Sequence, residues 1–313
     1  QNPFPNYEVE VADFDNDGRQ EIAYWFNPPF GVGDTTSRLV IYENNGRGSY
    51  TVDWDSTFRG GRGGTFGISD LDNDGHKEII ILQNNGIALL ECFGPRLYRY
   101  NKSNIGFPNR NDQNLLRVVV ADYDHDSRKE LMAVVVAHSA VQDPTLIFVS
   151  EFAGKGQSSD GWMFIFNMEL ARSQNLVSDI AVGQIDGVGL DEIVQGNGGF
   201  GINEHTAIDY FWRGSDGWRQ RQVFTGLQSG CLHPLFAEIT GDSVRELVAG
   251  GIGPFRHGSL FALQHLSDTT FRVLWADSSL ESSPLQLAVD NLTGTSCIII
   301  ATFRYTGIDQ MIN

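Results

Sequence analysis

Basic residues, cysteines and long apolar runs are scarce in this sequence, and each scarcity excludes a class of protein. Only 22 lysines and arginines accompany 39 aspartates and glutamates, and the net charge of −17 argues against binding to nucleic acids or to anionic membrane surfaces. Three cysteines in 313 residues are too few, and odd in number, for a disulfide framework. No stretch reaches the roughly 20 apolar residues that a membrane-spanning helix needs, so we expect no membrane insertion.

The sequence also lacks the motifs of common enzymes. Its seven histidines form no zinc-ligand spacing, and neither a Gly-x-Ser-x-Gly elbow nor a phosphate-binding loop is present. No long segment has the apolar periodicity of a helix, which leaves strands as the expected elements. We therefore predict an all-β protein that is not an enzyme. The alternative is a lyase or glycosidase that acts on polysaccharide through scattered loop carboxylates.

A short acidic stretch at residues 13–21 is the most informative feature that is present. The carboxylates at its positions one, three, five and nine are Asp13, Asp15, Asp17 and Glu21. Gly18 at position six permits the left-handed backbone of a tight loop, and the backbone carbonyl of Arg19 at position seven can join the carboxylates around one centre. An all-oxygen shell of this kind suits a hard cation, and we predict Ca²⁺. The apolar run 22–26 follows at once, so the loop joins two strands and not the two helices of an EF-hand.

The acidic stretch recurs with a period of fifty-odd residues, which is typical of a repeat architecture. Its six copies begin at residues 13, 70, 122, 184, 238 and 289, so successive copies are 57, 52, 62, 54 and 51 residues apart. In the second and third copies, the position-seven residues His76 and Arg128 are expected to coordinate through their backbone carbonyls. The predicted carboxylate ligands of these two copies are Asp70, Asp72, Asp74, Glu78, Asp122, Asp124, Asp126 and Glu130.

The last three copies keep fewer acids at the ligand positions. The weaker cation candidates in the fourth and fifth copies are Asp186, Glu192, Glu238, Asp242 and Glu246. The sixth copy, which begins at Val289, has no acid at these positions, and we predict no ion there. The sequence therefore predicts structural Ca²⁺ in the first three loops, all of them in the first half of the chain.

These loops resemble the FG-GAP (VCBS-like) repeat of integrin alpha-chain propellers and of secreted bacterial proteins. The pieces that give the repeat its name are partly present, as Phe66-Gly67 before the second loop and Val248-Ala249-Gly250-Gly251 after the fifth. The resemblance covers nearly the whole chain. It implies a β-propeller that is stabilised by calcium, lies outside the cell or at its surface, and serves in binding or adhesion.

Strand-like runs divide each repeat into about four strands, which predicts a single propeller domain over residues 1–313 with six four-stranded blades. The last blade is expected to be incomplete, because its runs end with a third strand at 307–312. A longer native chain, which would allow seven blades, is one source of the missing strand. Strand addition by another subunit, including self-association, is the other.

Three connections between predicted strands each carry a phenylalanine among glycines or prolines. In related propellers such connections lie on the face opposite the calcium loops, and this face serves recognition. The resemblance therefore makes Phe30, Phe200 and Phe255 candidate ligand-binding residues. The alternative is that each ring packs inward between blades. The predicted function is a binding or adhesion module for a glycan or a protein. The alternative from a different class is a structural subunit of an extracellular assembly.

Overall fold

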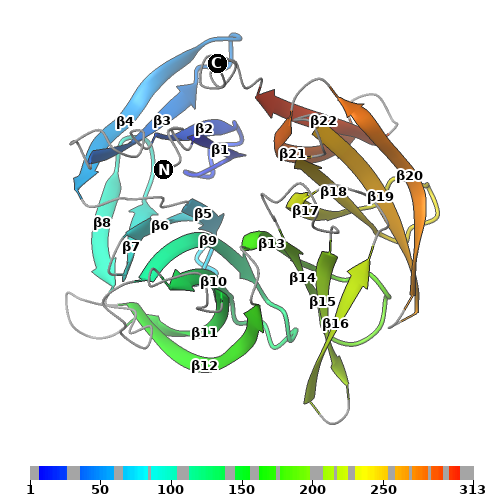
Figure 1. Ribbon diagram of the computed structural model, residues 1–313. Coiled ribbons are helices and arrows are strands. Elements are labelled where there is room, and N and C mark those ends of the chain that lie inside the picture. The colour runs from blue at the N-terminus through cyan, green and yellow to red at the C-terminus, as the bar shows by residue number, and fades with distance from the viewer. Residues whose placement is uncertain are drawn as a thin grey trace, which may run out of the picture. The chain divides into compact units, whose positions relative to one another are not determined.

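The computed structural model consists of β-strands and their connections in all the residues that it describes (Figure 1). These residues are 7–26, 36–59, 66–83, 86–103, 113–137, 145–155, 162–173, 177–197, 207–214, 217–224, 230–252, 258–267, 270–280, 283–291 and 296–303. Within them there is no helix that could span a membrane. The all-β prediction is confirmed for these segments.

The described strands form five four-stranded sheets and one two-stranded sheet, and neighbouring strands are antiparallel and consecutive in the chain. The first three sheets contain β1 (Tyr7–Ala12), β2 (Glu21–Phe26), β3 (Thr36–Asn44), β4 (Tyr50–Arg59); β5 (Phe66–Ser69), β6 (Glu78–Gln83), β7 (Gly86–Cys92), β8 (Tyr98–Ser103); and β9 (Gln113–Ala121), β10 (Glu130–Ala137), β11 (Thr145–Lys155), β12 (Trp162–Ser173).

The next two sheets contain β13 (Val177–Gly183), β14 (Glu192–Asn197), β15 (Ala207–Gly214), β16 (Gly217–Phe224); and β17 (Gly230–Ala237), β18 (Glu246–Ile252), β19 (Gly258–Ser267), β20 (Thr270–Leu280). The last pairs β21 (Ser283–Asn291) with β22 (Ser296–Phe303). A repeated four-stranded meander is typical of propeller blades, so the fold is propeller-like. The third strand predicted for the last sheet, at 307–312, lies outside the described residues.

The chain forms two compact units. The first consists of residues 1–122 and 126–172, and the second of residues 123–125 and 173–313. The first unit holds the sheets of β1–β4, β5–β8 and β9–β12, and the second holds the other three. That all of them form one domain stays a prediction.

The core of the first unit explains why its second strands are apolar at consecutive positions. Ile79, Ile80 and Ile81 on β6 are all buried. Ile79 and Ile81 pack in a cluster with Trp25, whereas Ile80 points the other way and packs in a cluster with Leu131. Both faces of the strand are therefore covered, which suits a continuous apolar run better than an alternating one.

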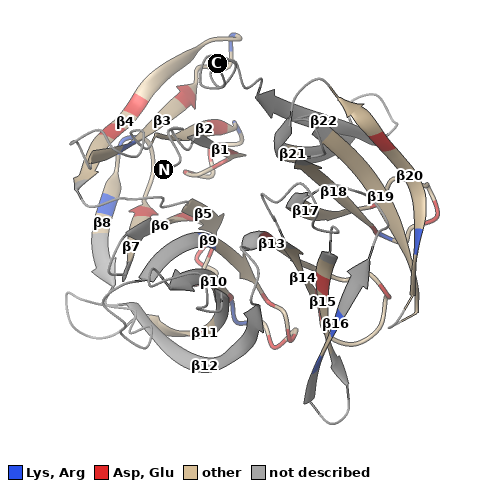
Figure 2. Cartoon of the chain, in the orientation of Figure 1, with Lys and Arg blue, Asp and Glu red and all other residues tan. Residues whose placement is uncertain are grey.

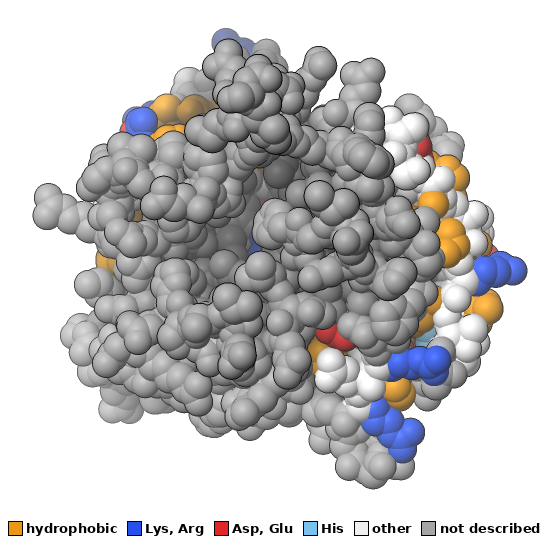
Figure 3. Space-filling model, in the orientation of Figure 1, with side chains coloured by type: hydrophobic (Ala, Val, Ile, Leu, Met, Phe, Trp, Pro, Cys, Tyr) orange, Lys and Arg blue, Asp and Glu red, His pale blue; other side chains and the backbone are white. Residues whose placement is uncertain are grey.

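The second unit is built on the same plan. Leu247 and Ala249 on β18 pack in a cluster with Tyr210, and Val248 between them packs in another cluster with Leu260. The outer strand β20 is far less covered: Val273 and Trp275 are 43% and 45% exposed. Figure 3 shows apolar side chains among polar ones along this edge.

The predicted acidic loops occupy one equivalent position in all five four-stranded sheets, between the first and the second strand. The loops cover residues 13–20, 70–77, 122–129, 184–191 and 238–245. Acidic residues lie in the loops after β1 and β9 (Figure 2). Because the two flanking strands are paired up to the loop, each loop is held closed at its base, as in the pairing of Ala12 with Glu21.

Candidate metal centres

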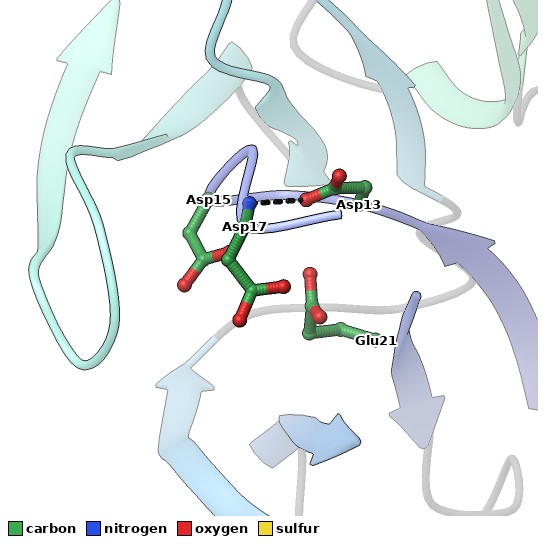
Figure 4. Close-up of side chains that lie close together, drawn as sticks. All are labelled: Asp13, Asp15, Asp17 and Glu21. Carbon is green, nitrogen blue, oxygen red and sulfur yellow. Dashed lines mark hydrogen bonds between the residues drawn. The ribbon is translucent and has the colours of Figure 1, made fainter. Parts of the chain in front are cut away.

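The first acidic loop brings its four predicted carboxylates together (Figure 4). One oxygen each from Asp13, Asp15, Asp17 and Glu21 lies within 4.8 Å of the others. Oxygens that coordinate Ca²⁺ lie about 2.3–2.6 Å from the ion, so two ligands on opposite sides of it are about 5 Å apart at most. The spacing of the four carboxylates therefore fits a shared Ca²⁺.

Hydrogen bonds within the loop hold the first carboxylate in place. The Asp13 carboxylate accepts hydrogen bonds from the backbone N–H groups of Asp17, at 3.1 Å, and Gly18, at 2.9 Å. This turn needs a left-handed backbone twice: Asn16 has a φ of 61° and Gly18 a φ of 88°. Asparagine tolerates that region and glycine adopts it without strain, which explains both residue types at these positions.

Two oxygens of the first loop are buried without a hydrogen-bond partner. Glu21 is 1% exposed, and its Oε2 accepts a hydrogen bond of 2.7 Å from the backbone N–H of Phe14. Its Oε1 has no partner, and neither has Oδ2 of Asp15, which is 8% exposed. Burial, with a smaller effect from Glu43 and the neighbouring aspartates, raises the pKa of Glu21 to about 7. Buried carboxylate oxygens without a donor are what a cation site presents in the absence of its ion.

The second and third loops repeat this geometry. Ligand atoms of the first, third and ninth positions lie within 4.8 Å of one another in each loop. The residues are Asp70, Asp72 and Glu78 in the second loop, and Asp122, Asp124 and Glu130 in the third. Asp70 accepts hydrogen bonds from the N–H groups of Asp74 and Gly75, both at 3.0 Å. In the third loop Ser127 takes the position of the glycine, with a φ of 75°, and its N–H donates to Asp122 at 3.0 Å.

The structure places the position-five aspartates differently in the three loops. Asp17 belongs to the cluster of its loop, although its carboxylate also accepts hydrogen bonds from the Arg19 side chain. Asp74 forms a cluster with Asp72 and Glu91 of β7, whose ligand atoms lie within 4.8 Å of one another. Asp126 belongs to none of the clusters found among the described residues, and Nε of Arg128 lies 3.9 Å from its Oδ2. Arginine at position seven would thus compete with a bound cation for the position-five carboxylate.

The sequence analysis missed a glutamate on the third strand that neighbours each of the first three acidic loops. Glu91 on β7 pairs in register with Glu78, and Glu151 on β11 pairs with Glu130. Glu91 is 3% exposed and lies with Asp72 and Asp74. Glu43 of the first sheet lies 3.3 Å from Arg19, and Glu151 forms an ion pair with Arg128. Only the strand register identifies these residues, because they lie 13 to 22 positions beyond the ninth residue of each loop.

The fourth loop has the same backbone path with a different centre. Gln184 at position one accepts hydrogen bonds at Oε1 from the N–H groups of Gly187 and Val188, at 3.0 and 3.2 Å. Its Nε2 donates to the carbonyls of Gly189 and Leu190, both at 3.3 Å. Leu190 is the position-seven residue, whose carbonyl is expected to bind the ion in the other loops. The side-chain amide of Gln184 thus donates hydrogen bonds to carbonyls at the place where a cation is expected in the other loops.

The fifth loop satisfies its glutamate in another way. Oε2 of Glu246 accepts a hydrogen bond of 3.0 Å from the N–H of Ile239, as Glu21 does from Phe14. Its Oε1, however, accepts one of 3.1 Å from the hydroxyl of Thr240 at position three. Neither this loop nor the fourth contains a cluster of three potential ligands, although the structure describes both loops completely. Their weaker candidates are Asp186, Glu192, Glu238, Asp242 and Glu246.

Comparison with known proteins identifies the first part of the chain. Residues 13–81 match the family model of the FG-GAP-like repeat. The match begins at Asp13 and contains the first two acidic loops and the Phe66-Gly67 pair. A search among curated proteins finds no significant match. The repeat that the acidic loops resemble is therefore confirmed over the first two copies.

Solved structures support the fold over most of the chain. The C-terminal domain of PilY1 from Pseudomonas aeruginosa is 11% identical, has a TM-score of 0.55, and is matched over 94% of this chain and 82% of its own. A lectin from Agrocybe aegerita, solved to explain its specific recognition of non-reducing terminal N-acetylglucosamine, is 16% identical with a TM-score of 0.53. That match covers 94% of this chain and 74% of the lectin. At these identities the likeness concerns the fold alone.

Phe30, Phe200 and Phe255 lie outside the described part of the chain, so their role in ligand binding stays a prediction. The sixth loop is described only up to Asn291 and again from Ser296. The backbone carbonyls of Arg19, His76 and Arg128 also stay predicted ligands.

Proposed function

We propose that this chain is a calcium-stabilised β-propeller of the FG-GAP type that works outside the cell as a binding module for a glycan or a protein. The proposal combines the repeat match at residues 13–81 with the propeller-like sheets and the acidic loops. In it, the six sheets are six blades of one domain, and the module is not an enzyme. The observation that carries the calcium part is the pair of buried oxygens, Glu21 Oε1 and Asp15 Oδ2, that have no donor.

The role that we assign to the ion is structural. Bound Ca²⁺ would neutralise the carboxylates that close each of the first three loops. The chain's own groups do the rest: Asp13 orders the turn through two N–H groups, and Glu21 ties the second strand back to Phe14. The ion would thereby link the end of β1 to the start of β2, and likewise in the next two sheets.

The metal content is tested by mass spectrometry of the native protein and by terbium luminescence with Ca²⁺ as competitor. We expect three bound ions per chain, and a loss of one ion in each of the variants Asp15→Asn, Asp72→Asn and Asp124→Asn. The variant Asp242→Asn in the fifth loop is the control and should lose none. A chain that binds no ion at millimolar Ca²⁺ would refute this part of the proposal.

The ligand class is the second part of the proposal. A glycan is favoured because a protein of the same fold is a lectin that recognises terminal N-acetylglucosamine. A glycan array should therefore show binding, with N-acetylglucosamine-terminated chains as the first class to compare with galactose-terminated ones. The variants Phe30→Ala, Phe200→Ala and Phe255→Ala should weaken binding. Trp275→Ala, on the exposed outer strand β20, is the matched aromatic control.

A glycan array without any signal, obtained with calcium-loaded and folded protein, would contradict the glycan ligand. Product analysis on polysaccharide mixtures tests the absence of catalysis in the same preparation, and released oligosaccharides would show that the chain is an enzyme.

A further inference from the structure

The first three acidic loops contact one another in sequence. The carbonyl of Phe14, at position two of the first loop, accepts a hydrogen bond of 3.4 Å from the N–H of Lys77 in the second. Asn16 lies beside Gly75: its Nδ2 would be 3.8 Å from a Cβ placed on that glycine. Asn73 of the second loop donates a hydrogen bond of 3.4 Å from Nδ2 to the Ser127 carbonyl of the third.

The contacts use two positions of the repeat. Position four presents its side chain to the following loop in all three cases, and the position-two carbonyl of the first loop, Phe14, also accepts a hydrogen bond from the next loop. The pattern continues within the second unit, where the Tyr123 carbonyl accepts a hydrogen bond of 2.9 Å from the N–H of Asp191. His125, at position four, has Nε2 at 3.0 Å from Oδ1 of the same aspartate. The position-four side chain therefore lies at the following loop in three successive copies of the repeat.

The left-handed backbone at position four directs these side chains. Asn16, Asn73 and His125 have φ values of 61°, 57° and 59°. Positive φ in a residue other than glycine is uncommon, although asparagine and histidine are enriched there. Three such residues at one repeat position give the loops a common conformation, with position four at the contact with the following loop.

The same contacts lie next to the groups that would bind calcium. The Phe14 carbonyl accepts the hydrogen bond from Lys77, and the Phe14 N–H donates one of 2.7 Å to Glu21. Lys77 precedes Glu78, whose carboxylate closes the second loop by accepting from Leu71 at 2.7 Å. Asn73 stands between two predicted ligands, Asp72 and Asp74.

From this arrangement we propose that the first three loops bind calcium with positive cooperativity, and that the inter-loop hydrogen bonds carry the coupling. The inference rests on the proposed calcium binding. An ion that orders one loop fixes its contact residues, and so removes part of the conformational freedom that the next loop must lose when it binds. Couplings between sites are typically 5- to 150-fold, and we expect about fivefold here because the bonds are long and lie near the surface.

The test is a calcium titration of the full chain by calorimetry, with terbium luminescence as a second readout. The unmodified protein should bind three ions with a Hill coefficient above 1. Asn73→Gly removes the donor to Ser127 and keeps the left-handed backbone free of strain, so it should lower the Hill coefficient without changing the number of ions bound. Asn16→Gly should have a smaller effect, because the hydrogen bond between the main chains of Phe14 and Lys77 remains.

The matched control is Ser243→Gly in the fifth loop. Ser243 has a φ of 67°, so the exchange is again glycine for a left-handed residue, in a loop without a proposed ion. It should leave the Hill coefficient unchanged. Three ions bound with a Hill coefficient of 1 would overturn the coupling and leave the proposed function standing. A Hill coefficient above 1 that neither Asn73→Gly nor Asn16→Gly lowers would overturn the assigned contacts. A chain that binds no calcium would instead overturn the proposed function.

Discussion

The first and the fourth acidic loops follow the same path with opposite chemistry at the centre. In the first, Asp13 accepts two backbone hydrogen bonds and adds a negative charge. In the fourth, Gln184 accepts two equivalent bonds and also donates two, to the carbonyls of Gly189 and Leu190. The fourth loop is therefore closed by a donor of the protein itself, whereas the proposed function assigns this role in the first loop to a cation.

The glutamate at position nine shows the same contrast between the two units. It caps the position-two N–H in the first, second, fourth and fifth loops, as Glu21, Glu78, Glu192 and Glu246 do. Its second oxygen meets a hydroxyl in the fifth loop, from Thr240, whereas the equivalent residue of the first loop is Asp15, which has no proton to give when ionised. In the proposed function, a bound cation supplies the partner that Oε1 of Glu21 lacks in the first loop.

Calcium removal should have the largest effect, and it should destabilise the first unit more than the second. At a free Ca²⁺ concentration tenfold above the dissociation constant, each site contributes about 1.4 kcal/mol, and three independent sites about 4 kcal/mol. Chelation should therefore lower the melting temperature and raise amide exchange in β1, β2, β5, β6, β9 and β10 more than in β13–β20. Equal loosening of both units, measured by hydrogen-exchange mass spectrometry with calcium loss verified, would contradict it.

Substitutions at position three should reduce the difference between the first and the fifth loop. Thr240→Val removes the hydroxyl that bonds Glu246, which is fully buried, and should cost about 1–3 kcal/mol for the unsatisfied carboxylate oxygen. The control Thr240→Ser keeps the hydroxyl and should be nearly neutral. In the first loop, Asp15→Thr offers Glu21 the donor it lacks.

We expect the Asp15→Thr variant to lose one calcium ion and to be less sensitive to chelator than the unmodified chain. Denaturant unfolding with and without chelator measures this, and a variant that remains equally sensitive would show that the hydroxyl does not replace the ion.

The two units should also differ in their response to pH. Burial, more than the nearby aspartates, raises the pKa of Glu192 from 4.5 to about 7. The folded state thus favours the protonated form of Glu192. This contribution to folding stability is fully present below pH 4.5 and is lost as the pH rises toward 7, with a slope of at most about 1.4 kcal/mol per pH unit. Glu21 has a similar pKa, but a bound cation would hold it ionised and remove this dependence.

Melting curves between pH 4 and pH 8 check this difference. With saturating Ca²⁺, the residual destabilisation between pH 4.5 and 7 should shrink in Glu192→Gln, whose amide oxygen can still accept from Ile185. An unchanged pH profile in that variant would rule out Glu192 as its source.

The smallest expected effect concerns the arginines at position seven. Arg19 holds Asp17 and lies 3.3 Å from Glu43, whereas the second loop has His76 at this position. Arg19→Gln should raise the calcium affinity of the first loop by roughly two- to fivefold, because exposed ion pairs are weak competitors. Terbium titrations of single-site variants would measure it, and a lowered affinity would mean that Arg19 supports the site.

The position of the loops, the strands around them and the all-β class could be predicted from the sequence. Acids in alternation with a glycine at position six define a tight turn by local geometry alone, and an apolar run such as Ile79 to Ile81 defines a buried strand. Such signals depend on neighbours in the chain, so each copy of the repeat displays them. That the acids of the first three loops bind an ion stays a prediction.

Other features depend on residues that only folding brings together. Glu91 joins the second loop because the register of β6 and β7 places it opposite Glu78, and a shift of one residue would turn it to the other face. Side-chain packing across the loop likewise decides which donor an oxygen meets: Thr240 donates its hydroxyl to Glu246, and Gln184 donates its amide to the carbonyl of Gly189. The number of acids in each loop predicts where a cation would be electrostatically favourable. The three-dimensional arrangement of hydrogen-bond donors decides whether a loop needs a cation, because a buried oxygen is stable only when it has a hydrogen-bond donor or an ion as partner.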